Sequence, residues 1–104
     1  LTSSGARSGK PRTTPLVYSV DGDRLVIVAS KGGAPTHPAW YHNLVAHPQA
    51  TVEVGDEKFE ARTMVAGPAE RERLYAQHAS DMPAFDDYKR KTSRVIPVVI
   101  IERI

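Results

Sequence analysis

The apolar residues of this chain fall into short runs, most of which alternate with polar residues as in a β-strand. One run, Leu25 to Ala29, is apolar on both faces and is therefore expected to be a central strand. The longest run, Val95 to Ile101, contains Pro97, whose missing amide hydrogen predicts an edge or a bulge. The pattern predicts strands over residues 13–20, 24–30, 51–54, 58–65 and 95–101, with the end of another strand at 1–4.

Turn and helix patterns lie between these strands. Asp21-Gly22-Asp23 and Gly55-Asp56 are typical of β-hairpin turns. Helices are predicted over residues 38–46 and 69–79 and in a short stretch after Pro83, and in the first of them Trp40 and Leu44 would face the core. The order β–β–α–β–β–α–α–β predicts an α+β fold that is mainly β. We expect one domain over residues 1–104, a small antiparallel barrel with helices at its openings.

Composition narrows the chemistry. The chain has 104 residues, 40% of them hydrophobic and 25% charged, as in a globular protein of one domain. It has no cysteine, so thiolate nucleophiles, disulfides and cysteine-ligated metals are excluded, and redox chemistry would need a bound cofactor. The net charge of +2 is too small to indicate nucleic-acid binding. No apolar run approaches the roughly 20 residues of a membrane span and no signal-peptide pattern is present, so a cytoplasmic location is expected.

Two segments have the composition of anion-binding loops. Arg7, Ser8, Lys10 and Arg12 lie in a turn rich in glycine and proline, which suits a phosphate or a carboxylate. The same composition is also typical of a solvated loop. The second segment, Ala29 to Gly33, follows an apolar strand and would either let a ligand approach its backbone or form an ordinary turn.

The stretch from His37 to Asn43 opens the first predicted helix, where amide groups attract anions. Its aromatic residues Trp40 and Tyr41 would stack near a planar ring, although Trp40 is equally suited to anchoring the helix in the core. Residues five apart on a helix are turned about 140° from one another. No metal site is therefore expected from the three histidines with this spacing, His37, His42 and His47.

Another candidate cluster is Met82, Phe85 and Tyr88, whose spacing of three places them on one wall of the short helix. They would close over an apolar substrate, with the Tyr88 hydroxyl as a donor, or form a stripe of the core. The cations that follow are expected to complement the helix C-terminus and to face solvent. These cations are Lys89, Arg90, Lys91 and Arg94.

Five stretches together form a specific pattern: Leu1 to Arg12, Pro15-Leu16, Val28 to Ala34, His37 to Leu44, and Arg94 to Val98. In these stretches the chain closely resembles the deazaflavin-dependent nitroreductase family, the actinobacterial oxidoreductases that use reduced coenzyme F420. The resemblance covers essentially the whole chain. It implies an FMN-binding-like split β-barrel that passes a hydride from F420 to a small planar acceptor, a quinone or a nitro compound.

The resemblance also implies which residues bind the cofactor. Its phosphate end would be held by Ala6, Arg7, Ser8, Arg12 and Thr13. The deazaflavin ring would lie against Thr14, Pro15, Leu16, Val17, Val28, Ala29, Ser30 and Lys31. The helix start would complete the site with Ala39, Trp40, Tyr41, His42 and Asn43, and Phe85 would approach the ring from the substrate side.

The acceptor would be bound by Val17, Met82, Phe85 and Tyr88. Ser30 and Tyr88 are the predicted catalytic residues, because their hydroxyls would donate to the acceptor oxygen as it gains negative charge. The family's substrate wall is often rich in tyrosine, whereas Val17, Met82 and Phe85 fill three of these positions here. Fewer hydroxyls argue against bicyclic nitroimidazole substrates and are compatible with quinone reduction.

Other functions stay open at this stage. An FMN-dependent split barrel would use the same basic turn for its phosphate. A non-catalytic deazaflavin carrier would bind the cofactor without passing on its hydride, and a nucleic-acid-binding protein would lose affinity steeply with salt. The resemblance further implies menaquinone as the acceptor, which would require peripheral contact with the inner face of the cell membrane, and pairing into homodimers.

Overall fold

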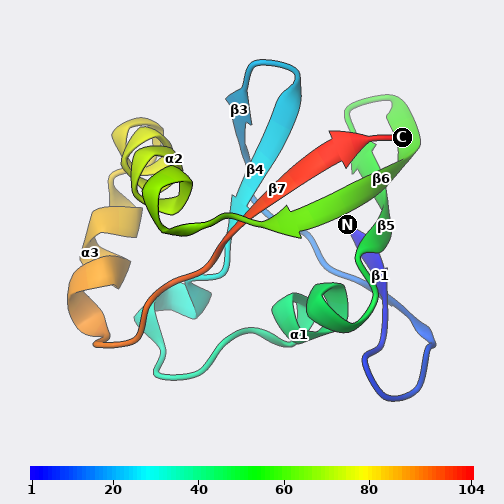
Figure 1. Cartoon of the computed structure of the whole chain (residues 1–104), viewed down its shortest axis with the longest axis horizontal. Coiled ribbons are helices and arrows are strands. Elements are labelled where there is room, and N and C mark those ends of the chain that lie inside the picture. Colours follow the sequence, from blue (N-terminus) through cyan, green and yellow to red (C-terminus); the bar gives the residue numbers. More distant parts are fainter.

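Residues 1–104 form a single curled antiparallel sheet with three helices on its outside and at one end (Figure 1). The structure is a computed structural model, and it describes the whole chain. The strands are β1 (Thr2–Ser4), β2 (Pro11–Thr13), β3 (Ser19–Asp21), β4 (Arg24–Val28), β5 (Gln49–Val54), β6 (Glu57–Val65) and β7 (Val98–Arg103). The helices are α1 (Ala39–Ala46), α2 (Pro68–Asp81) and α3 (Ala84–Lys91), with a short 3-10 turn, η1, at Lys31–Gly33.

The strand order is β2-β1-β5-β6-β7-β4-β3, which confirms the predicted α+β class. Every neighbouring pair in the sheet is antiparallel. The sheet does not close, because β2 and β3 stay at its two edges, as expected for a split barrel. Strand β4 lies between β3 and β7, away from the edges, as its apolar pattern predicted.

The two faces of β4 pack into two separate apolar cores. Val26 and Val28 belong to a cluster that α2 and α3 cover with side chains such as Leu74. Ile27 and Ala29 belong to a second cluster, on the face that α1 closes. A strand with apolar side chains on both faces buries apolar surface on both, and each Å² buried stabilises the fold by roughly 25 cal/mol. This is why the sequence of β4 has no polar alternation.

The predicted strand over residues 13–20 was wrong. Strand β2 ends at Thr13 and β3 begins at Ser19, and the residues between them, 14–18, are extended without a neighbouring strand. Here the chain crosses from one edge of the sheet to the other, so no partner strand is available, and Pro15 has no amide hydrogen to donate. The pairing of β1 with β2, closed by a bond from Gly5 N to Lys10 O of 2.8 Å, was not predicted, since three-residue strands carry little periodicity.

The last strand was also misplaced. β7 covers Val98–Arg103, so residues 95–97 lie outside it and the charged residues Glu102 and Arg103 lie within it. Pro97 is neither an edge nor a bulge residue. It precedes the strand, and its carbonyl oxygen accepts a bond of 2.9 Å from Ala29 N. None of the helices is long and apolar enough to cross a membrane.

His78 is a buried polar group that ties α2 to the edge strand β3. It is 0% exposed, its Nδ1 lies 2.8 Å from Ser19 Oγ, and its Nε2 has no hydrogen-bond partner. The edge of the Phe85 ring packs against it, with the ring centroids 4.4 Å apart. Burial lowers the pKa of His78, because the charged imidazolium would be poorly solvated there.

Stability should therefore fall on acidification. The unfolded chain, with a histidine pKa of about 6.5, takes up the proton before the folded chain does. The contribution of neutral His78 is complete above about pH 6.5 and is lost below it, by up to about 1.4 kcal/mol per pH unit. Urea unfolding measured at about pH 7.5 and pH 5.5 should show that the parent loses more free energy of unfolding on acidification than His78→Gln does. The control His47→Gln, which replaces an exposed histidine, should lose as much as the parent. Equal losses in all three proteins would contradict the prediction.

Candidate functional site

The turn between β1 and β2 is fixed to helix α1 by one hydrogen bond. Ala6 N donates to Asn43 Oδ1 at 2.9 Å, across 37 positions of sequence. Asn43 is buried on α1, so this bond ties the turn to a fixed position on the helix. Two residues predicted for the same cofactor site, Ala6 and Asn43, thus lie side by side.

The cations of this turn have no carboxylate partner. Arg7, Lys10 and Arg12 are exposed, and none of them takes part in an ion pair. Ser8 Oγ accepts from Lys10 N at 3.2 Å, which helps to hold the turn. The three cations are thus available to an anion, because no intramolecular carboxylate competes for them.

The carboxylates that form ion pairs lie away from the β1–β2 turn. Asp21 accepts from Arg24 at 2.5 Å and from Arg73 at 3.2 Å, and these two hydrogen bonds lower the pKa of Asp21 to about 2. This ion-pair group lies at the β3–β4 hairpin and α2, not at the β1–β2 turn. None of the ion pairs of the protein therefore involves a cation of the β1–β2 turn.

The crossing segment 14–18 presents its two faces to different surroundings. Leu16 packs into the core that α1 closes, and with Pro15 it lines an apolar cavity of about 250 Å³ at the end of the barrel. Val17 points outward and is 56% exposed. The amide groups of residues 16–18 have no hydrogen-bond partner in the chain. The segment therefore offers a ligand backbone donors and the Val17 side chain, while Leu16 is committed to the core.

Strand β4 leads into a left-handed turn. Lys31 (φ 47°), Gly32 (φ 63°) and Gly33 (φ 83°) follow one another in this region, which costs a residue such as lysine roughly 1 kcal/mol. Gly33 is needed for a second reason. A Cβ there would lie 2.9 Å from Tyr88 O and 2.8 Å from Lys91 Cβ, so helix α3 packs directly on the glycine backbone.

Ser30 lies at the start of this turn and is 5% exposed. Its hydroxyl has no hydrogen-bond partner in the chain, and neither does the hydroxyl of Tyr88 on α3. Ser30 directly precedes η1, and η1 packs against α3, the helix that carries Tyr88. The two predicted catalytic donors are thus unused by the fold.

Arg94 was expected to face solvent, and this was wrong. Its side chain is half-buried and donates to Ser30 O at 2.7 Å and to Ala29 O at 3.1 Å. It also donates to Ala34 O at 2.8 Å and to His37 Nδ1 at 2.9 Å. The role of Arg94 was missed because its partners lie about 60 positions away. A lone arginine just before the apolar run from Val95 was the available signal.

At the start of α1, the rings of His37 and His42 lie 5.8 Å apart. Histidines five apart were expected not to approach one another, and this was wrong for this pair, because His37 precedes the helix and does not follow its rotation. Tyr41 packs against His37 at 4.9 Å. Trp40 is buried in the barrel core, so its ring serves the fold. No group of three or more metal-ligating side chains occurs in the structure.

The predicted substrate wall is largely part of the core. Phe85 is 7% exposed, and its ring contacts His78 and Tyr88, the latter at 5.2 Å between centroids. Tyr75 Oη donates to Phe85 O at 2.5 Å, and burial raises the pKa of Tyr75 to about 12, so this donor keeps its proton. Met82 packs against the same cluster. Of the wall residues, Val17 is exposed, and Met82 and Tyr88 are half-buried.

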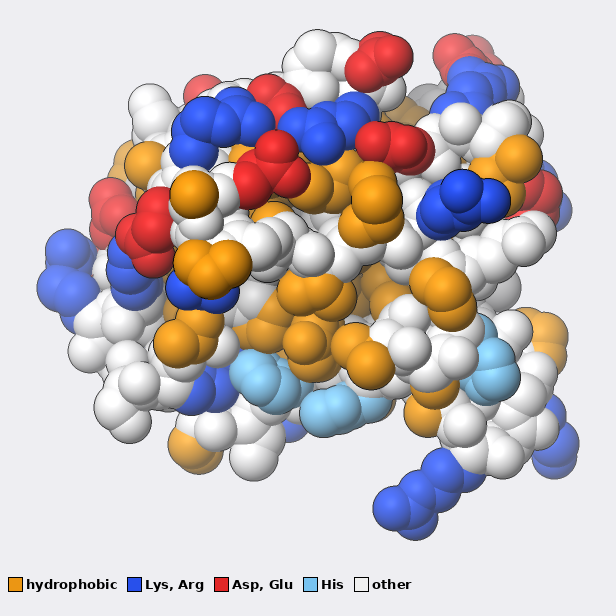
Figure 2. Space-filling model, viewed as in Figure 1, with side chains coloured by type: hydrophobic (Ala, Val, Ile, Leu, Met, Phe, Trp, Pro, Cys, Tyr) orange, Lys and Arg blue, Asp and Glu red, His pale blue; other side chains and the backbone are white.

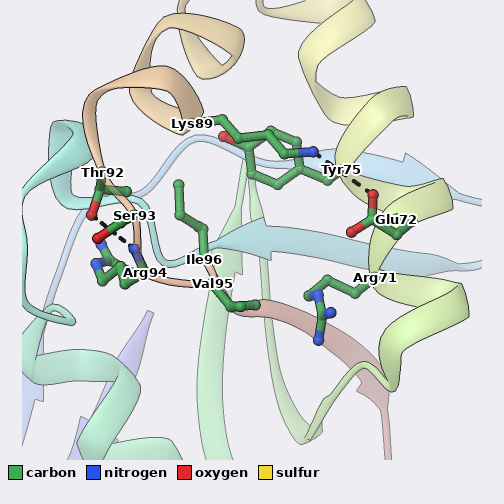
Figure 3. Close-up of a pocket in the computed structure, with 9 residues that line it drawn as sticks. All are labelled: Arg71, Glu72, Tyr75, Lys89, Thr92, Ser93, Arg94, Val95 and Ile96. Atoms are coloured by element: carbon green, nitrogen blue, oxygen red, sulfur yellow. Dashed lines mark hydrogen bonds and ion pairs between the residues drawn. The ribbon is translucent and has the colours of Figure 1, made fainter.

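A polar pocket on the α2–α3 side, of about 250 Å³, contains none of the predicted site residues (Figure 3). Across its top, Lys89 runs over the Tyr75 ring toward Glu72, 3.7 Å from its carboxylate. Arg94 lines this pocket through its backbone, where its N donates to Thr92 Oγ1 at 3.3 Å. Its guanidinium is directed to the η1 loop instead.

Comparison with solved structures defines the class of protein. The chain matches a structure described as an F420-H2 dependent reductase (FDR-A) with a TM-score of 0.88 and 38% identity, over 97% of this chain and 90% of that one. A second structure, described as a domain-swapped dimer, matches with the same score and identity over 97% of this chain and 76% of that one. The fold is therefore that of a split-barrel oxidoreductase that uses coenzyme F420.

Sequence comparison identifies the family. The chain is 41% identical over 106 aligned residues to an F420H(2)-dependent quinone reductase of Mycobacterium tuberculosis, covering 99% of this chain and 71% of that protein. A family model described as F420H(2)-dependent quinone reductase matches residues 1–103. The chain belongs to the F420H(2)-dependent quinone reductase family, and the resemblance found in the sequence is confirmed.

Proposed function

We propose that this protein transfers a hydride from reduced F420 to a quinone, with the cofactor lying along α1 from the β1–β2 turn to the η1 turn. In Figure 1 these two turns lie at opposite ends of α1, the β1–β2 turn in dark blue and η1 in cyan. Contacts join α1 to β1 and η1 to α3. The arrangement suits a long ligand with an anionic end and a flat ring, since the cations occupy one end and the unused hydroxyls the other.

The observation that carries the proposal is the set of polar groups that the fold leaves without partners. Arg7, Lys10 and Arg12 lack carboxylates, and the hydroxyls of Ser30 and Tyr88 lack hydrogen bonds. Lys31 donates only to Thr36 Oγ1 at 3.2 Å. The cations fit the anionic phosphate and glutamate tail of F420, and the two hydroxyls are left to donate to the oxygen of the acceptor.

The residues of the site would position and stabilise rather than react. Bound F420 supplies the hydride, so the chain needs no redox group of its own. Arg7 and Arg12 would hold the phosphate, and Val17 and the backbone from Val28 to Lys31 would lie against the ring. Ser30 and Tyr88 would donate to the acceptor oxygen, where negative charge grows as the hydride arrives.

The finer features of the acceptor also belong to this proposal. A nitro compound would accept the hydride while its oxygen is bound by the same two hydroxyls.

A quinone dissolved in a membrane would require contact with the lipid surface. Figure 2 shows apolar side chains gathered on the face around α1 and β6, bordered by histidines. Val45 of α1 and Val65 of β6 are both exposed. A homodimer would match the dimeric state named for one structural neighbour.

The test is oxidation of reduced F420, followed by its absorbance, with and without menadione. The parent protein should turn over only with the acceptor present, and F420 fluorescence titrations should show binding that excess FMN does not displace. Binding without turnover with any quinone or nitroaromatic would leave a deazaflavin carrier instead. Displacement by FMN would favour the flavin alternative.

Removing the two hydroxyls should slow the reaction. We expect Ser30→Ala and Tyr88→Phe each to lower kcat by roughly 10- to 100-fold, because a donor to a developing negative charge contributes about 1.4 to 3 kcal/mol to the barrier. Ser80→Ala, which replaces an exposed serine of α2, is the matched control and should keep the parent's kcat. Unchanged turnover in Ser30→Ala and Tyr88→Phe would remove the assignment of these residues.

A further inference from the structure

The guanidinium of Arg94 is bound entirely by uncharged acceptors. Three are carbonyl oxygens, those of Ala29, Ser30 and Ala34, at 3.1, 2.7 and 2.8 Å. The fourth is His37 Nδ1, at 2.9 Å. No carboxylate pairs with Arg94. One planar cation thus joins both ends of the η1 loop to the segment that opens α1.

These contacts dictate where two amide groups point. In a trans peptide unit, the carbonyl of one residue and the N–H of the next point in opposite directions. Because the carbonyl oxygens of Ala29 and Ser30 are directed at Arg94, the N–H groups of Ser30 and Lys31 point away from it. Neither N–H has a hydrogen-bond partner in the chain. Arg94 therefore faces the acceptor side of these two peptide units and leaves their donor side open.

We propose that Arg94 is a positioning residue that fixes these two peptide planes, so that the amides of Ser30 and Lys31 face bound F420. The inference rests on the proposed function and adds to it the group that orients the loop. The turn has two backbone bonds of its own, from Gly33 N to Ser30 O at 2.9 Å and from Ala34 N to Lys31 O at 3.1 Å. Neither of them holds the Ala29 carbonyl, and Lys31 is in the strained left-handed region, so the loop needs a further group to fix it. The guanidinium has five N–H groups in one plane, a geometry that a lysine ammonium cannot reproduce.

The same group sets the tautomer of His37. Arginine has no acceptor, so His37 Nδ1 must accept the bond and the ring proton lies on Nε2. Burial, the Arg94 charge and His42 lower the pKa of His37, which agrees with a neutral ring. Arg94 thereby holds the loop and the start of α1 in one fixed relation.

The first test uses the unmodified protein. On saturation with F420, the backbone ¹⁵N–¹H resonances of Ser30 and Lys31 should shift more than those of Gly55 and Asp56 in the distant β5–β6 turn. An F420-saturated parent in which the Ser30 and Lys31 resonances do not move overturns the proposal, whatever the behaviour of any variant.

The second test replaces Arg94 by lysine, which keeps the charge and loses the planar donors. Arg94→Lys should weaken F420 binding by roughly 5- to 30-fold, as expected for one or two lost hydrogen bonds of about 1 kcal/mol each, and should abolish the shifts at Ser30 and Lys31. Arg71→Lys, on an arginine that forms no ion pair and lines the pocket of Figure 3, is the control and should behave as the parent. In Arg94→Ala, millimolar guanidinium but not ammonium should restore part of the affinity.

The outcomes separate this inference from the proposed function. Parent-like affinity and amide shifts in Arg94→Lys would overturn the role of Arg94 and leave the enzyme activity standing. A parent that binds F420, shifts both amides and fails to reduce any quinone would overturn the proposed function and support the positioning role. If Arg94→Lys does not fold, the shifts in the parent and the guanidinium effect in Arg94→Ala decide.

Discussion

The double variant Arg7→Ala/Arg12→Ala should bind F420 roughly 30-fold more weakly than the parent protein. Hydrogen bonds to a charged group contribute about 1.5 to 3 kcal/mol each when shielded. Both arginines are exposed, so solvent screening reduces this to about 1 kcal/mol each, which together correspond to a factor of about 30 in Kd. The Kd of F420 is measured by fluorescence titration at low and at high salt. It should depend less on salt in the variant than in the parent.

The matched control is Lys58→Ala/Arg62→Ala. It removes the same two charges from exposed positions on β6, and neither cation forms an ion pair there. A general loss of positive field would weaken both variants equally, whereas a phosphate site at the β1–β2 turn predicts a large effect only in the first. Undiminished affinity in Arg7→Ala/Arg12→Ala would show that the anionic end of F420 is bound elsewhere.

Gly33→Ala should lower the free energy of unfolding by about 3 kcal/mol or more. Gly33 has a φ of 83°, which costs an alanine roughly 1 to 2 kcal/mol. Its Cβ would also lie 2.9 Å from Tyr88 O, and displacing a packed helix backbone adds about 1 to 3 kcal/mol. Thermal unfolding should show a decrease in Tm on the order of 10 °C or more.

Gly32→Ala separates the two costs. Gly32 has a φ of 63°, and nothing lies within 4 Å of the position that an added Cβ would take, so only the backbone cost of about 1 kcal/mol applies. If Gly33→Ala were no less stable than Gly32→Ala, α3 would not pack on the glycine backbone as described. The pair thus measures the contact that brings Tyr88 to the η1 loop.

Local composition was enough to propose part of the candidate site. The cations Arg7, Lys10 and Arg12 were predicted to form an anion-binding turn or a solvated loop, and Ser30 was proposed as a donor. The structure leaves these groups without partners, as such a site requires. By contrast, Phe85 and Trp40 were assigned to ligand contacts, whereas the structure buries both. A stripe of aromatic residues has the same spacing whether it faces a ligand or the core, so sequence spacing does not distinguish the two.

For the fold, the local sequence was enough to distinguish strands from helices wherever a segment contained several repeats of its hydrophobic pattern. The β3–β4 and β5–β6 hairpins, the two-sided apolar strand β4 and the three helices all follow from local alternation and turn residues. Each of these features depends on neighbours within a few positions, so the local sequence contains the information.

How distant segments meet became clear only from the three-dimensional arrangement. Arg94 binds Ser30 from 64 positions away, Ala6 binds Asn43 from 37 positions away, and the crossing segment 14–18 has no strand to pair with. These relations depend on the path of the chain through the whole sheet and not on the residues beside each position. A guanidinium takes its role from the acceptors that the fold brings to it, which is why Arg94 resembles a surface charge in the sequence and holds a loop in the structure.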